Sequence, residues 1–159
     1  VVPRPTADTD APPPGTGRWI LRSAWASNAL AAAVTIPCAL GANGLLGLAQ
    51  AVCIGLFLVS IPVWTWAFVA AMVRTTKGDN IVIGNLFWLS GSAPKPVRIS
   101  LRLAVLTSVL IAAATAAATP FATLVPMLPL GLTGLWGSRY GRFPARPKPA
   151  MARTRRTGG

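Results

Sequence analysis

Side chains that could carry acid–base chemistry are few in this sequence. It has no His and no Glu, and its three carboxylates are Asp8, Asp10 and Asp79. General acid–base catalysis uses mainly His, Glu, Asp or a tuned Lys. Asp8 and Asp10 fall in a Pro-rich segment, so Asp79 is the one carboxylate expected in the folded part. A lone carboxylate forms neither a catalytic dyad nor a metal cluster. The sequence therefore predicts a protein that is not an enzyme and has no metal and no cofactor.

Two other groups of side chains are weak candidates for a chemical role. Ser90, Ser92 and Lys95 could suggest a Ser–Lys nucleophile, but they lie in a stretch broken by Gly and Pro. Cys38 and Cys53 lie in apolar runs without CxxC spacing, which is typical of small buried hydrophobic residues. A disulfide between them stays open, because both fall toward the same end of adjacent predicted helices.

The composition excludes an ordinary soluble globule. Of 159 residues, 53% are hydrophobic and 11% are charged, against roughly 25% charged in soluble domains. Fifteen Lys and Arg against three acidic residues give a net charge of +12. Such charge can attract nucleic acid. Here the cations flank long apolar runs, which is the pattern of membrane topology signals. We expect no nucleic-acid partner.

A helix that crosses a bilayer needs about 20 mainly apolar residues. Four apolar runs approach or exceed this length, so the sequence predicts an all-α polytopic membrane protein with four transmembrane helices. The predicted spans cover residues 23–40, 45–73, 103–119 and 121–137.

The remaining segments complete the predicted organisation. Residues 1–17 form a disordered Pro-rich tail, 18–138 a four-helix transmembrane domain, and 139–159 a basic Pro-rich cytoplasmic tail. In the central loop, the apolar run 81–89 is too short to span, so we expect an interfacial or re-entrant segment.

The distribution of Lys and Arg predicts the topology. Three precede the first span, five lie in the central loop and seven lie in the C-terminal tail, while the connections at 41–44 and 119–120 have none. The positive-inside rule then places both termini and the central loop in the cytoplasm, in a multi-pass protein of the cytoplasmic (inner) membrane.

Candidate interaction residues lie in the central loop and near the end of the second span. Trp64 and Trp66 lie eight to ten residues before Arg74, roughly 12–15 Å along a helix. We expect them to pack within the bundle or against a partner, unless the helix protrudes. Asp79 could instead pair with a nearby cation while Asn80 caps a short helix. The full set is Lys77, Asp79, Asn80, Trp88, Trp64 and Trp66.

Small residues recur every fourth position in the third span, at Ala104, Ser108, Ala112 and Ala116. Such a stripe lets two helices approach closely. We expect it to pack against the fourth span, with a homo-oligomer face as the alternative.

The basic tail is expected to bind anionic lipid headgroups, at about 1 kcal/mol for each close cation, or to dock an acidic partner. The cations are Arg139, Arg142, Arg146, Lys148, Arg153, Arg155 and Arg156.

Three stretches carry a resemblance to known sequences: KGDNI at 77–81, SAPK at 92–95 and LWGSRYGRFP at 135–144. They resemble small, uncharacterised actinobacterial multi-pass integral membrane proteins, and the resemblance extends over most of residues 18–147. It implies a small multi-pass membrane protein and supplies no catalytic or binding residue.

Two functional hypotheses follow from these patterns. The first is a non-catalytic accessory or assembly subunit of a larger membrane protein complex. The alternative is a small oligomeric transporter or channel for an uncharged or anionic solute, in which Asn28 and Gln50 would be the polar side chains to test.

Overall fold

The fold is built from helices, as the composition predicts. The computed structural model describes residues 16–77, 86–87, 89 and 93–143. Within them, the long helices are α1 (Arg18–Ala39), α2 (Leu46–Thr76), α4 (Lys95–Thr115) and α5 (Met127–Tyr140). Two short 3-10 helices, η1 (Asn43–Leu45) and η2 (Pro120–Leu124), form the turns after α1 and α4. No strand occurs in these described ranges, which confirms the all-α class.

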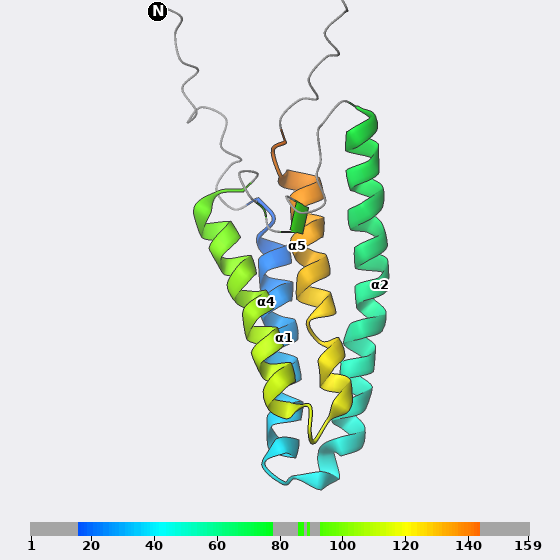
Figure 1. The fold of residues 1–159 in the computed structure, drawn as a ribbon, viewed down its shortest axis with the longest axis vertical. Helices are drawn as coiled ribbons and strands as arrows, with labels where there is room; N and C mark the ends of the chain where they lie inside the picture. The colour runs from blue at the N-terminus through cyan, green and yellow to red at the C-terminus, as the bar shows by residue number, and fades with distance from the viewer. Residues whose placement is uncertain (1–15, 78–85, 88, 90–92, 144–159) are drawn as a thin grey trace, which may run out of the picture.

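Successive helices run in opposite directions along the bundle (Figure 1). The start of α1, the end of α2, the start of α4 and the end of α5 therefore lie together at what we call the basic end. All described Lys and Arg side chains belong to these termini: Arg18, Arg22, Arg74, Lys77, Lys95, Arg98, Arg102, Arg139 and Arg142. The opposite end, with η1 and η2, has no charged residue among those described.

Three segments among the described residues are long and apolar enough to cross a membrane. They are Asn43–Thr76, Lys95–Thr115 and Pro120–Tyr140. The 22-residue helix α1 is not among them, because Arg18, Arg22 and Asn28 contribute polar groups to an otherwise apolar helix. The structure thus supports a helical membrane protein with three candidate spans, and the predicted fourth span is not confirmed.

The last two spans differ from the predicted ranges. We expected 103–119, but α4 covers Lys95–Thr115, since a proline is favourable in the first turn of a helix and Pro96 occupies that place. We expected one helix over 121–137. Instead η2 ends at Leu124 and α5 begins at Met127, after Pro126. The helix is interrupted here because proline supplies no N–H to continue the preceding hydrogen-bond ladder. Helix α5 itself has 14 residues and is about 21 Å long.

Helix α5 is the central element of the bundle. Its residues from Gly131 to Ser138 are all buried, and Leu132 and Trp136 pack in the same core cluster as Ile20 of α1, Ala67 of α2 and Leu101 of α4. Figure 1 shows α2 and α4 on opposite sides of α5. Their outer faces therefore carry most of the exposed apolar surface.

Candidate functional site

Arg74 ties the end of α2 to the end of α5 at the basic end. Its guanidinium donates hydrogen bonds to the carbonyls of Gly141 (2.7 Å) and Ser138 (3.2 Å). The same guanidinium lies 5.2 Å from the ring centroid of Phe143. A cation at a helix C-terminus satisfies carbonyls that have no partner within the helix and opposes the negative end of the dipole. From the sequence, Arg74 was expected only as a topology signal, because its contact with the end of α5 joins residues that are far apart in the chain.

The two tryptophans of α2 have different surroundings. Trp64 faces the bundle, where its indole N–H donates to the Met127 carbonyl at 2.8 Å. Its ring lies 5.6 Å from that of Phe68 and 4.8 Å from that of Phe87, centroid to centroid. The backbone of Gly131 passes beneath the indole, because a Cβ there would come within 2.7 Å of Trp64 Cδ1. Trp64 is thus part of the packing between α2 and α5.

Trp66 points outward and is 59% exposed. The guanidinium of Arg139, from α5, lies 5.6 Å from its ring centroid, a cation–π distance. The long Arg139 side chain therefore reaches along the bundle to Trp66, so this ring is closer to fixed positive charge than the spacing from Arg74 suggested.

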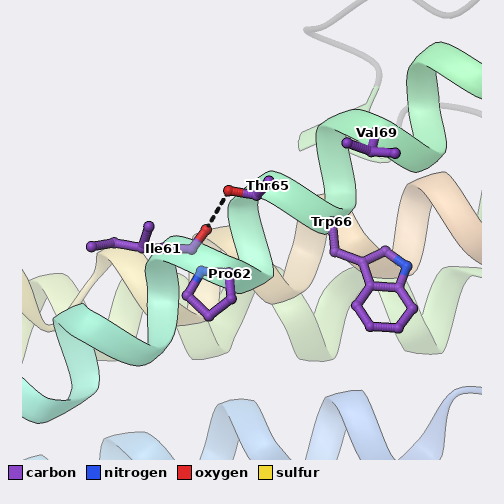
Figure 2. A pocket seen from close by; sticks show the side chains of 5 residues that line it. All are labelled: Ile61, Pro62, Thr65, Trp66 and Val69. Carbon is purple, nitrogen blue, oxygen red and sulfur yellow. Dashed lines mark hydrogen bonds between the residues drawn. The ribbon is translucent and has the colours of Figure 1, made fainter.

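A shallow depression of about 520 Å³ lies on the outer face of α2, lined by Ile61, Pro62, Thr65, Trp66 and Val69. Figure 2 shows Pro62 and the Trp66 indole projecting to the same side of the helix. The Thr65 hydroxyl donates to the Ile61 carbonyl at 2.9 Å (Figure 2). This bond uses the hydroxyl within the helix, so the depression presents mainly apolar surface.

The small-residue stripe of α4 faces inward. Ala104, Ser108 and Ala112 are buried and Ala116 is half-buried. The expected partner was the fourth span, but α4 packs more extensively on α1 than on α5. The amide of Asn28 on α1 donates to the Ala104 carbonyl at 2.7 Å. This approach is possible because alanine leaves the α4 backbone accessible.

Most buried hydroxyls in the described bundle donate to a carbonyl three or four residues earlier in the same helix. Examples are Thr35 to Ala31, Thr115 to Ile111 and Thr133 to Pro129. Asn28 differs, because its Nδ2 bonds to another helix while its buried Oδ1 has no partner among the described atoms. The indole N–H of Trp136 is also buried without a described partner.

Several predicted site residues lie outside the described ranges. They are Asp79, Asn80, Trp88, Arg146, Lys148, Arg153, Arg155 and Arg156, together with most of the run 81–89. Lys77 is exposed just after the last residue of α2. Of the cations expected to bind lipid, Arg139 and Arg142 are described and both are exposed. The described part therefore brings Trp66 and Arg139 together, two residues that the sequence analysis assigned to separate roles.

Cys38 and Cys53 are buried free thiols in the structure. Cys38 packs with Val34 and Ala49, and its thiol contacts the Val34 carbonyl at 3.2 Å. Cys53 belongs to a separate cluster with Ala31 and Val125. Both side chains act as small core residues in this arrangement.

Comparison of the chain with protein-family models, with curated proteins and with solved structures finds no match.

Proposed function

We propose that this protein is a non-catalytic accessory or assembly subunit of a larger membrane complex, and that its partner docks on the outer face of α2. The observation that carries the proposal is Trp66, which is 59% exposed and borders the depression beside Pro62. Exposed tryptophans next to a concave apolar surface are frequent anchors of protein interfaces. Between membrane helices, association depends on close van der Waals packing, which a depression permits.

The extent of α2 supports the same docking face. Its 31 residues are about 46 Å long, more than a 30 Å hydrocarbon core requires. In the most apolar 18 residues of the segment that contains α2, 17% of the residues are buried within the bundle. In the corresponding 18 residues of the segment that contains α5, 67% are buried. A single chain thus leaves most of α2 available to lipid or to another membrane protein.

We also propose that α1 crosses the membrane as a fourth span, and that the basic end faces the cytoplasm with both termini on that side of the cytoplasmic membrane. The supporting observation is the collection of all described cations at this end of the bundle. Cytoplasmic segments next to membrane helices are enriched in Lys and Arg. The exposed Arg139 and Arg142 would then lie near anionic headgroups.

Site-specific photocrosslinking in native membranes tests the docking face. A photoreactive amino acid at Val69, on the edge of the depression, should give a discrete crosslink to a protein that also co-purifies with the tagged chain in mild detergent. The matched probe at Leu110, which is 60% exposed on α4, should not give that crosslink. Equal crosslinking at both positions would contradict a specific docking face.

Removing the anchor should release the partner. We expect Trp66→Ala to weaken binding of the crosslinked partner about thirtyfold or more, because interface anchors contribute about 2 kcal/mol or more. Trp19→Ala, which removes a 48% exposed tryptophan from α1, is the matched control and should leave recovery unchanged. Consistent purification of the wild-type chain as a lone monomer would overturn the proposal.

A small oligomeric transporter or channel for an uncharged or anionic solute is the second candidate. The observation that favours it is Asn28 Oδ1, a buried acceptor with no described partner. Because Asn28 is buried between α1 and α4 of one chain, a solute path that uses this acceptor has to open between these two helices. This function requires solute flux in proteoliposomes that is lost in Asn28→Leu but retained in Ala29→Leu, an exposed neighbour. Undiminished flux in Asn28→Leu would exclude a role for this side chain.

A further inference from the structure

A second concave surface lies between α2 and α4, with α5 forming its floor. This groove has a volume of about 620 Å³. Trp64 and Phe87 form one side, a stripe of α4 forms the other, and Leu130 and Thr133 of α5 lie beneath. The α4 residues are Arg102, Val105, Leu106 and Val109.

The polar atoms of the groove walls are largely engaged within the protein. The Trp64 indole N–H donates to Met127, and the Thr133 hydroxyl donates to Pro129. The donor hydrogens of these two residues are therefore already used within the protein. Together with the aliphatic side chains of α4, the two residues make a surface suited to a hydrocarbon chain rather than to a polar solute.

Charge is confined to one end of the groove. Among the described residues that line it, Arg102 alone is charged. Arg102 is nearest the basic end, whereas Val109 lies seven residues further along α4, about 10 Å deeper by helical rise. The groove thus has a cationic entrance at the basic end and an apolar interior, the same order of charge as a phospholipid entering from the membrane surface.

We propose that this groove binds one anionic phospholipid, with its phosphate at Arg102 and an acyl chain along Val105, Val109 and Leu130. The guanidinium presents five N–H donors in a planar fork, so Arg102 can hold a phosphate while keeping contacts with the protein. The described basic end has nine cations and no carboxylate, so it favours an anionic headgroup over a zwitterionic one. The apolar length of the groove favours a lipid over a free phosphate.

This lipid site is separate from the proposed docking face. The groove is lined by Trp64, whereas the depression on the outer face of α2 is lined by Trp66. Loss of lipid binding and loss of the protein partner are therefore expected in different variants.

Native mass spectrometry of the delipidated full chain, titrated with phosphatidylglycerol or phosphatidylcholine, tests the proposal. The wild type should bind one phosphatidylglycerol more tightly than phosphatidylcholine. In Arg102→Gln we expect phosphatidylglycerol affinity to fall about fivefold, the equivalent of one cation close to an anionic lipid. Phosphatidylcholine affinity should fall by less, because its choline cation already neutralises its phosphate. Arg18→Gln, which removes an exposed cation outside the groove lining, should have no such effect.

Filling the groove tests the acyl chain separately. Val109→Trp should abolish tight binding of both lipids, whereas Leu110→Trp, one residue further on and outside the groove lining, should not. Leu106→Trp provides a second groove-filling variant if the first does not fold, as judged by far-UV circular dichroism. Glycerol phosphate, which has the charge but no chain, should not compete.

Three results would overturn the proposal. The first is equal loss of binding in Arg102→Gln and Arg18→Gln, which would indicate general attraction to the basic end. The second is unaltered binding in folded Val109→Trp and Leu106→Trp. The third is displacement of phosphatidylglycerol by glycerol phosphate at a concentration equal to that of the lipid.

Discussion

Individual side chains of this protein gain their roles from residues far away in the sequence. Trp64 and Trp66 are separated by one residue, yet Trp64 bonds to Met127 while Trp66 lies under Arg139. Two residues correspond to about 200° of helical rotation, so neighbouring tryptophans face opposite sides of α2. Their contribution to packing or docking follows from that rotation.

Glycines on α5 make room for bulky neighbours. A Cβ at Gly131 would come within 2.7 Å of Trp64 Cδ1, and one at Gly134 within 2.5 Å of Phe87 Cε1. At Gly137 the obstacle is the Leu86 carbonyl, 2.8 Å away. Glycine in the interior of a helix is unfavourable in itself. The structure shows that these glycines permit close approach of aromatic rings and backbone.

The cost of removing this space can be measured. We expect Gly131→Ala to lower the free energy of unfolding by about 1–3 kcal/mol, as overpacking does in other cores, because the indole of Trp64 is held by its bond to Met127. Gly55→Ala is the matched control, since a Cβ there meets nothing within 4 Å. Its effect should be neutral or slightly stabilising, because alanine is the better helix former.

Unfolding in mixed detergent micelles, followed by circular dichroism, compares the two glycine variants directly. Equal stability of Gly131→Ala and Gly55→Ala would mean that Trp64 moves aside without cost, and that the contact between α2 and α5 is loose.

At the scale of the elements, α4 has two faces with different surroundings. The face with Ala104, Ser108 and Ala112 is buried, and Ala104 on this face accepts the hydrogen bond from Asn28 of α1. The opposite face exposes Leu103, Leu106 and Leu110. Close contact with α1 explains why small residues occupy the first face. Exposure to hydrocarbon explains why large apolar residues are tolerated on the other.

The stripe therefore predicts an asymmetric response along α4. Ala112→Leu should destabilise the folded chain by about 1–3 kcal/mol through overpacking, whereas Ala113→Leu, at an exposed position, should change stability by less than about 0.5 kcal/mol. The measurement is unfolding in detergent, with chemical crosslinking to record the oligomeric state. If Ala112→Leu instead caused an oligomer to dissociate while each chain stayed folded, the stripe would be an interface between copies of the chain.

At the scale of the whole molecule, alternation of helix direction collects the cations. Positions as distant as Arg18, Arg74 and Arg139 meet at one end because α1, α2, α4 and α5 alternate in direction (Figure 1). An even number of antiparallel helices returns the chain to its starting end. The proposed topology depends on this arrangement and on the placement of the bundle across a bilayer.

Cysteine accessibility tests that topology. In a background with Cys38→Ala and Cys53→Ala, Lys77→Cys and Arg142→Cys should react with an impermeant maleimide only in inside-out vesicles. Gly44→Cys, in the turn between α1 and α2, should react only in intact cells, because it lies at the other end of the bundle. Labelling of Lys77→Cys and Arg142→Cys from opposite sides would exclude the proposed orientation.

The sequence by itself determined that the protein is helical, where its long apolar segments lie and how its cations are grouped. These properties are local, since hydropathy and charge act through each residue's own preference for lipid or water. The start of α4 and the break before α5 were less predictable, because proline has different positions at the two helix starts. Pro96 lies within the first turn of α4, whereas Pro126 lies just before the first residue of α5.

Only the tertiary structure decided that α5 is the central helix, that the α4 stripe faces α1 and that Arg102 borders a groove with Trp64. Apolar residues favour a lipid environment and a helical core almost equally, so hydropathy does not distinguish the outside of such a bundle from its inside. The distinction depends on steric fit, because glycines and alanines leave space in which one particular neighbouring side chain or helix can pack. Those neighbours are distant in the chain, which is why the sequence did not reveal them.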